Sequence, residues 1–316
     1  MNDYHSHVSI TTPVDFLSLV PHLLNYHPSA GIAGVFLAGT QVALAACIAN
    51  LSDPDTIAMN FIKTAYSSNC DRGILIAYCG PKDRETLEAI RKISDQLESN
   101  NIDVPTLFRV HDQRYYELGC DQPDCCPPNG SPLPQWTPTS DLVAATTGEL
   151  PAASRDDITN EYSPVDRSAA KEVEATMRLR LATEDPSLTM PPKEALTNAV
   201  RWMDELPSVN GILDLVICAV RREVRTELYK HIVTTPRPNG ARAWLFVARH
   251  FTGPIAARAL TLHGLCAYRN GDGVRARIAL ESALDRDPFF NDVDLFLTAL
   301  NEGVHPDALE QQLFPE

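Results

Sequence analysis

Apolar and polar residues alternate along the chain in two ways, which divide it into a front part with strands and helices and a back part with helices alone. The front part predicts helices near 13–24, 53–67 and 83–98, and strands at 32–38, 41–48, 73–79 and 104–110. Gly39 and Thr40 separate the first two strands, which is typical of a hairpin. The segment 73–79 is apolar almost throughout, as expected of a strand buried on both faces. The order strand, helix, strand over 73–110 predicts a parallel βαβ unit within a mixed sheet.

The segment 119–140 interrupts this pattern. Prolines are frequent among the polar residues there, among them Pro127, Pro128, Pro132, Pro134 and Pro138, which indicates an extended connection. A short helix near 140–146 and a loose stretch follow. We therefore predict an α/β domain over 1–150 that includes the Pro- and Cys-rich loop 119–140, a linker over 151–165, and an all-helical domain over 166–316.

Helical patterns fill the back part, at 166–183, 193–206, 209–232, 241–252, 255–269, 273–286, 291–301 and 306–313. One neighbouring pair has the spacing of a tetratricopeptide hairpin, with small residues at Gly264, Ala276 and Ala283 and a proline at Pro288. We expect the small residues at a close helix contact and a helix end just before the proline. The chain holds no second good copy, so an ordinary pair of antiparallel helices with a glycine turn is the alternative.

Charge argues against nucleic-acid binding. The formal net charge is −14, and residues 1–165 carry 9 Lys and Arg against 20 Asp and Glu, which repels phosphate backbones. The densest basic run, 221–225 with Lys230, has helical spacing and predicts the solvated face of an amphipathic helix.

Neither a membrane span nor a signal peptide is predicted. No apolar run approaches the roughly 18 residues that cross a bilayer, and residues 1–13 lack the basic and apolar regions of a signal peptide. We expect a cytoplasmic protein whose eight cysteines stay reduced.

The carboxyl ends of the two predicted parallel strands are one candidate site, because ligands of open α/β sheets bind there. This rule makes Tyr78, His111, Asp112, Arg114 and Tyr115 candidates for a ligand-binding pocket. A hydrogen-bonded structural cluster is the alternative. The chain has no phosphate-binding glycine loop, nucleophile elbow or paired histidines, so no cofactor and no catalytic residue is predicted.

Cys120, Cys125 and Cys126 form the most unusual local pattern. Three thiolates can hold a soft metal such as zinc, but the spacing is not that of C-x2-C pairs and adjacent cysteines should diverge. A fourth ligand would have to come from His111 or Asp124.

We therefore expect a structural loop without metal, in which Cys120 or Cys125 is buried beside His111 or Tyr78. A metal site and a redox-active thiol are the alternatives. Three sulfur atoms that converge with a fourth ligand would favour the metal, and dispersed sulfur atoms would exclude it.

Three segments resemble one family. They are Pro21 to Pro28 before a hydrophobic strand, the box Cys120-x4-Cys125-Cys126-Pro127-Pro128-x-Gly130, and the tail from Gly271 to Pro288. Together they resemble an actinobacterial family known only as domain of unknown function 4192, and the resemblance covers nearly the whole chain. It implies a soluble cytoplasmic protein of an actinobacterium and no particular activity.

Three functions follow as hypotheses. The first is a non-catalytic binding or adaptor protein, with a protein partner on the helical domain. The second is an enzyme or small-molecule sensor that uses the pocket at the strand ends. The third is a zinc or thiol-redox role of Cys120, Cys125 and Cys126. The sequence leaves the activity, the ligand and the oligomeric state open.

Overall fold

The computed structural model describes residues 10–183, 189–205, 208–237 and 239–314. Residues 1–9, in which the sequence predicts no signal peptide, lie outside the described residues. The chain divides into two compact units, Met1–Asp157 and Ile158–Glu316, and each is described by itself. None of the helices in the described ranges is both long and apolar enough to cross a membrane.

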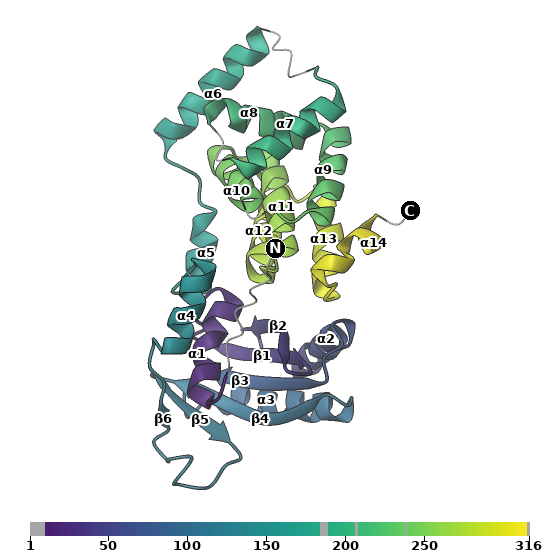
Figure 1. Cartoon of the computed structure of the whole chain (residues 1–316). Coiled ribbons are helices and arrows are strands. Elements are labelled where there is room, and N and C mark those ends of the chain that lie inside the picture. Colours follow the sequence, from purple (N-terminus) through teal and green to yellow (C-terminus); the bar gives the residue numbers. More distant parts are fainter. Residues whose placement is uncertain (1–9, 184–188, 206–207, 238, 315–316) are drawn as a thin grey trace. The chain divides into compact units, whose positions relative to one another are not determined.

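The first unit is a six-stranded mixed sheet with helices on both faces (Figure 1). Its elements are α1 (Pro13–Leu24), β1 (Gly31–Ala38), β2 (Gln41–Ile48), α2 (Pro54–Ser67), β3 (Arg72–Tyr78), α3 (Arg84–Ser99), β4 (Asp103–His111), β5 (Arg114–Leu118), β6 (Ser131–Pro132) and α4 (Pro138–Thr147). The strand order is β2-β1-β3-β4-β5-β6. Only β3 and β4 pair in parallel, and β1 and β2 form the predicted hairpin. The predicted mixed sheet with a parallel βαβ unit is confirmed.

Local capping explains where the helices of this unit begin. The side chains of Thr12, Asp53 and Asp83 each accept a hydrogen bond from the backbone N–H three residues later, at the starts of α1, α2 and α3. Pro13 and Pro54 directly follow two of these caps, where a missing N–H costs nothing. Each cap contributes about 1 kcal/mol to helix stability.

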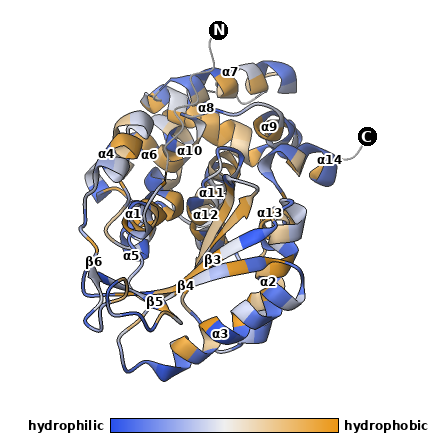
Figure 2. Cartoon of the chain, turned by 60° about the horizontal axis from the view of Figure 1, so that its bottom comes forward, coloured by the Kyte–Doolittle hydropathy of each residue, from blue (hydrophilic) through white to orange (hydrophobic). Residues whose placement is uncertain are grey.

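The core lies on both faces of the sheet. Phe36 of β1, Phe61 of α2 and Ile90 of α3 belong to one buried cluster, and α2 and α3 show the mixed colouring of helices with one apolar side (Figure 2). On the opposite face Phe16 of α1 lies 6.5 Å from Phe108 of β4, measured between ring centroids. The segment 75–77 of β3 is completely buried, as predicted for a strand covered on both sides.

The strand β5 was not predicted, and it changes where the cysteine loop begins. Asp112 and Gln113 form a two-residue turn with φ of 48° and 56°, after which β5 runs antiparallel to β4 until Leu118 pairs with Leu107. Four residues of strand carry the chain roughly 13 Å back from His111. The cysteine-rich loop therefore begins away from the carboxyl ends of β3 and β4.

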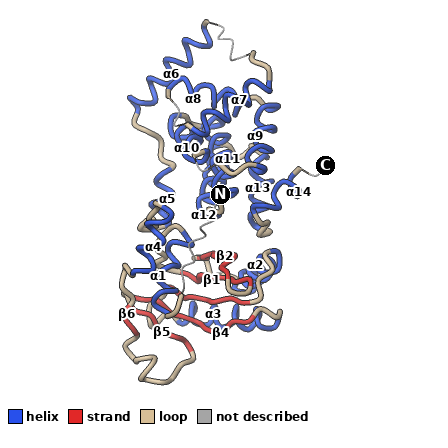
Figure 3. Tube along the Cα trace, viewed as in Figure 1, coloured by secondary structure: helices blue, strands red, loops and turns tan. Residues whose placement is uncertain are grey.

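The second unit is helical throughout its described part. Its elements are α6 (Arg167–Ala182), α7 (Pro192–Asp204), α8 (Val209–Val220), α9 (Arg222–Thr234), α10 (Gly240–His250), α11 (Gly253–Arg269), α12 (Gly273–Arg286), α13 (Asp292–Asn301), the 3-10 helix η2 (Pro306–Ala308) and α14 (Leu309–Leu313). A further helix, α5 (Arg155–Glu161), lies where the sequence predicts the linker. The predicted all-helical region is confirmed, and Figure 3 shows it entirely in helix and loop colours.

One predicted helix, 209–232, is two. The backbone of Arg221 is extended, with φ −73° and ψ 113°, and separates α8 from α9. Arg225 explains the break, because its Nη1 donates to the carbonyl oxygens of Ala219 (2.8 Å) and Val220 (3.3 Å) at the end of α8. The last carbonyls of a helix have no partner within it, so a cation at this position stabilises the end.

Arg225 also corrects the interpretation of the basic run 221–225 as wholly solvated. Its side chain is only 7% exposed and its Nε lies 3.0 Å from Asp292 Oδ2. The run therefore has one inward-facing cation.

The tetratricopeptide-like hairpin is formed by α11 and α12. A Cβ placed on Gly264 would lie 3.1 Å from Leu280 Cγ and 3.2 Å from the carbonyl oxygen of Ala276, so a side chain there would force these neighbours to shift. Ala276 and Ala283 are completely buried, and α12 ends at Arg286, just before Pro288. Both expectations for the hairpin are confirmed.

Replacing Ala283 with leucine should destabilise the helical unit by about 1–3 kcal/mol, because the added side chain overpacks a filled contact. Asp285→Leu is the matched control, since Asp285 is exposed on the same helix, and it should change stability by less than about 0.5 kcal/mol. Urea unfolding followed by circular dichroism measures both. Equal effects of the two substitutions would contradict the close contact.

Candidate functional site

The loop between β5 and β6, which we call the cysteine loop (119–130), projects from the edge of the sheet (Figure 3). Its far end is held firmly. Arg114 Nη1 donates to the carbonyl oxygens of Asn129 (3.2 Å) and Gly130 (2.7 Å), and the Tyr116 hydroxyl donates to Asn129 O (3.1 Å). The Arg109 guanidinium lies 3.8 Å from the centre of the Tyr116 ring and supports it from β4.

Replacing Gly130 with alanine should cost about 2 kcal/mol, because two effects add there. Gly130 has a φ of 72°, and a Cβ would lie 2.6 Å from Cζ of the Tyr116 ring, which is held in place by the contacts above. Gly148→Ala is the matched control, since its φ is 70° and nothing lies within 4 Å of its added Cβ, so it should cost only about 1 kcal/mol. Urea unfolding measures the difference, and equal costs would mean that Tyr116 does not support the loop.

The three cysteines of this loop converge. The Sγ atoms of Cys120 and Cys125 are 3.2 Å apart and those of Cys125 and Cys126 are 3.5 Å apart, and all three lie within 4.8 Å of one another. A tight turn produces this, because the backbone N–H groups of Cys125 and Cys126 both donate to Gln122 O (3.3 and 2.7 Å). The expectation that adjacent cysteines diverge is wrong for this turn. The Cys125 side chain is exposed, not buried as expected.

Glu117 of β5 supplies a carboxylate oxygen beside the thiols. Its Oε2 lies 3.8 Å from Cys126 Sγ, while its Oε1 accepts a hydrogen bond of 3.0 Å from the Thr106 hydroxyl of β4. Thr106 thus orients the carboxylate and leaves the other oxygen facing the thiols. The converging group formed by the described residues holds the three cysteines alone. Glu117 lies beside this group, and the two fourth ligands expected from sequence, His111 and Asp124, are not in it either. The sequence missed Glu117 because it lies on the unpredicted strand.

The pKa values of the three thiols differ. Hydrogen bonds from the Cys126 thiol, then from the Gln122 backbone N–H and the Cys125 thiol, lower the pKa of Cys120. The same network, in which Cys120 is the negative partner, raises the pKa of Cys125 and raises that of Cys126 to about 12. Of the three thiols, Cys120 is therefore the one whose pKa favours deprotonation.

This arrangement can hold a soft cation. Tetrahedral zinc with Zn–S bonds near 2.3 Å needs sulfur atoms roughly 3.8 Å apart, and the Cys120–Cys125 and Cys125–Cys126 separations are only slightly shorter. A cation between the sulfur atoms would replace the protons that the thiols now share.

The candidate residues at the strand ends do not form one pocket. Tyr78 pairs with Val110, and Val110 pairs with Tyr115, so both tyrosines lie on the face that α1 covers. Tyr78 is buried there, and burial raises its pKa. His111 and Arg114 pair with each other and lie on the opposite face.

The structure brings only some of these groups together. His111 Nε2 lies 3.2 Å from Asp112 Oδ2, a contact at the exposed hairpin turn. Arg114 is directed to the end of the cysteine loop, as described above. In the structure Arg114 thus holds the end of the cysteine loop and does not point toward Tyr78.

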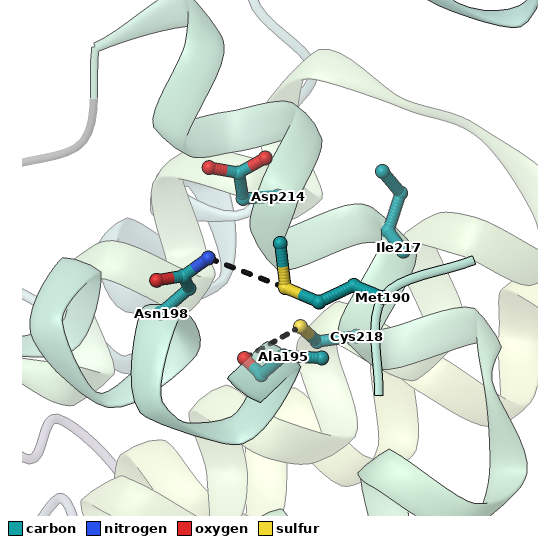
Figure 4. A pocket seen from close by; sticks show the side chains of 6 residues that line it. All are labelled: Met190, Ala195, Asn198, Asp214, Ile217 and Cys218. Carbon is teal, nitrogen blue, oxygen red and sulfur yellow. Dashed lines mark hydrogen bonds between the residues drawn. The ribbon is translucent and has the colours of Figure 1, made fainter. Parts of the chain in front are cut away.

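A pocket in the second unit is too small for a substrate. It is lined by Met190, Ala195, Asn198, Asp214, Ile217 and Cys218 (Figure 4). Its volume is about 10 Å³, which is room for one water molecule at most. Cys218 Sγ donates to Ala195 O (3.2 Å) and Asn198 Nδ2 contacts Met190 Sδ (3.4 Å), so its polar groups are already satisfied.

Similarity to known proteins identifies the family of the chain but no activity. The family model described as Domain of unknown function (DUF4192) matches residues 13–307. The chain therefore belongs to this family, as its cysteine box and helical tail suggest. No curated protein and no solved structure matches the chain.

Proposed function

We propose that this protein binds a soft divalent metal ion, with zinc as the best fit, through the cysteine loop. The observation that carries the proposal is the convergence of Cys120, Cys125 and Cys126, whose sulfur atoms lie within 4.8 Å of one another. The Glu117 carboxylate contacts Cys126 Sγ at 3.8 Å and would complete four-fold coordination, with Thr106 orienting it.

The composition of the ligand set supports zinc over hard cations. Thiolates prefer zinc, copper(I) and iron–sulfur clusters, whereas magnesium and calcium take oxygen ligands. All eight cysteines are free thiols, in keeping with a cytoplasmic location, which we also propose. In this function the ion fixes the turn of the cysteine loop at the sheet edge.

Metal content tests the proposal directly. The untagged chain, purified with a thiol reductant and without chelators, should retain one zinc ion per chain by elemental mass spectrometry. Cobalt(II) substituted for zinc should give the visible bands of tetrahedral coordination and a charge-transfer intensity that corresponds to three thiolates. A reduced protein that takes up neither ion would contradict the proposal.

Thr106→Val is the most specific variant for the carboxylate. It removes the hydroxyl that orients Glu117 and keeps the shape of the side chain, so zinc affinity should fall by about 10-fold. Thr56→Val is a matched control because Thr56 also donates to a carboxylate, that of Asp53 (2.7 Å), away from the cysteines. It should leave zinc affinity unchanged. An unchanged affinity in Thr106→Val would remove Glu117 from the ligand set.

Binding of a protein partner by the helical unit is a second proposal. Phe289, which follows the tetratricopeptide-like hairpin, is 89% exposed, whereas the next residue, Phe290, is buried. Exposed aromatic residues of this kind often anchor protein contacts. A photo-crosslinking phenylalanine analogue at position 289 should give a discrete crosslinked species in cells. The same analogue at exposed position 285 should not, and equal labelling would contradict the proposal.

A further inference from the structure

Two of the three sulfur atoms are placed for a covalent bond between them. The Sγ atoms of Cys120 and Cys125 are 3.2 Å apart, about 1.2 Å more than in a disulfide. Cys125 and Cys126 also touch, but their Cα atoms are about 3.8 Å apart across a trans peptide, less than disulfides accept, and the described peptide bonds include none in cis. Cys120 and Cys126 are also within 4.8 Å of each other, but Cys120 and Cys125 have the shortest Sγ–Sγ separation and are therefore the pair that closes most readily.

The loop has both the access and the freedom for this closure. Cys125 is exposed and Cys120 is half-buried, so small oxidants reach both sulfur atoms. Gly119 precedes the pair with a φ of 101° and open space around it. The backbone can therefore adjust at the start of the loop, while the bonds from Arg114 hold the other end at Gly130.

We propose that Cys120 and Cys125 form a reversible disulfide with a peroxide as the oxidant, and that this oxidation releases the metal ion. The sulfur of Cys120, which lies 3.2 Å from that of Cys125, attacks one peroxide oxygen, the O–O bond breaks, and the second oxygen leaves as water after taking up a proton. The sulfur of Cys125 then attacks the resulting sulfenic acid, the S–O bond breaks, and a second water leaves. Two sulfur atoms lose two electrons in total, and hydrogen peroxide becomes two waters.

The release step rests on the proposed metal function, whereas the disulfide does not. A disulfide sulfur carries no charge to donate, so oxidation leaves only Cys126 and Glu117 of the four ligands. Two ligands are too few for a stable zinc site. Bound zinc should in turn slow the oxidation of Cys120 and Cys125, because their sulfur lone pairs are then donated to the ion.

The experiment uses the full chain in two forms, metal-free and zinc-loaded, each treated with stoichiometric hydrogen peroxide. The metal-free chain should lose about 2 Da, the two hydrogen atoms of a new disulfide, and two of its eight cysteines should resist alkylation. Cleavage before aspartates gives the peptides Asp112–Cys120 and Asp124–Ser140, which should remain joined until a reductant is added. The zinc-loaded chain should react at least several-fold more slowly and release its ion to a chromophoric chelator as the link forms.

Variants keep the two claims separate. Cys126→Ser removes a proposed metal ligand and keeps the pair, so the metal-free variant should still form the disulfide. Cys125→Ser should not form it, and its Cys120 should instead accumulate sulfenic or sulfinic acid. A link in Cys125→Ser that joins Cys120 to Cys126, or overoxidation of the wild type without a link, would overturn the inference. If the link forms while zinc never binds, only the metal function and the release step fail.

Discussion

Replacing Cys126 with serine should weaken zinc binding by about 100-fold or more. Its sulfur lies 3.5 Å from that of Cys125 and 3.8 Å from Glu117 Oε2, between the thiols and the carboxylate. Loss of a group that only orients a ligand costs up to about 100-fold in affinity, so loss of a direct ligand should cost at least as much. This corresponds to about 2.7 kcal/mol of binding free energy. Competition with a chromophoric chelator under reducing conditions measures it.

The matched control for this variant is Asp124→Asn. Asp124 is an exposed acid in the same loop, two residues before Cys126, and the sequence suggested it as a ligand. Unlike Glu117, whose Oε2 lies 3.8 Å from Cys126 Sγ, Asp124 accepts no hydrogen bond from a thiol among the described residues, so its substitution should change the affinity by less than about 3-fold. If Cys126→Ser binds zinc as tightly as the wild type, Cys126 is not a ligand. If Asp124→Asn binds zinc much more weakly, Asp124 and not Glu117 is the oxygen ligand.

Most of the fold could be predicted because strong local signals mark its elements. The apolar run 73–79 identifies a buried strand, and Pro288 coincides with the end of α12. The strand β5 lacks such signals. It has only five residues, Arg-Tyr-Tyr-Glu-Leu, and its turn contains Asp112 and Gln113 where glycine is usual. Pairing with β4, which is not visible in the sequence, makes it a strand.

The candidate site was predictable in composition but not in geometry. Three nearby cysteines are visible in the sequence, but their convergence depends on a turn in which two backbone N–H groups share Gln122 O. Glu117 was missed for the reason that β5 was missed. Once Glu117 is placed opposite Phe108 in the register, it shares a sheet face with Thr106 and can be oriented by it. Long-range strand register, and not residue type, therefore places Glu117 beside the thiols.

The role of Arg225 in the helical unit could not be predicted from sequence either. Its partners are Asp292, which is remote in sequence, and two carbonyl groups at the end of the preceding helix α8. The sequence interprets 221–225 as a solvated face. In the structure the Arg225 guanidinium joins the end of α8 to Asp292, which lies 67 residues later. The Tyr229 hydroxyl also donates to Asp292 Oδ2 (3.0 Å), and Arg225 lies 5.1 Å from the Phe290 ring centre. Arg225 has the sequence spacing of an exposed helix face, but its side chain is thus part of the core.

Removing the carboxylate should therefore destabilise the helical unit strongly. Asp292→Ala leaves a nearly buried cation without its counter-charge, which costs about 3–5 kcal/mol in fully buried pairs. Because the Asp292 side chain is 35% exposed and the Arg225 side chain 7%, water compensates part of this loss, and we expect about 3 kcal/mol. Glu227→Ala is the control, since Glu227 pairs with Lys230 at 3.0 Å with both side chains about half exposed, and it should cost less than about 0.5 kcal/mol.

A double-mutant cycle separates the ion pair from the other contacts of Arg225. Arg225→Met keeps the apolar part of the side chain but removes the donors to Ala219 and Val220, so it should cost about 2 kcal/mol even when Asp292 is absent. The double variant should be more stable than the sum of the single losses predicts, by at least about 1 kcal/mol, because the unpaired cation is gone. Urea unfolding followed by circular dichroism supplies the four free energies. Strict additivity would mean that Asp292 and Arg225 act independently, and that the cation is retained only to cap the end of α8.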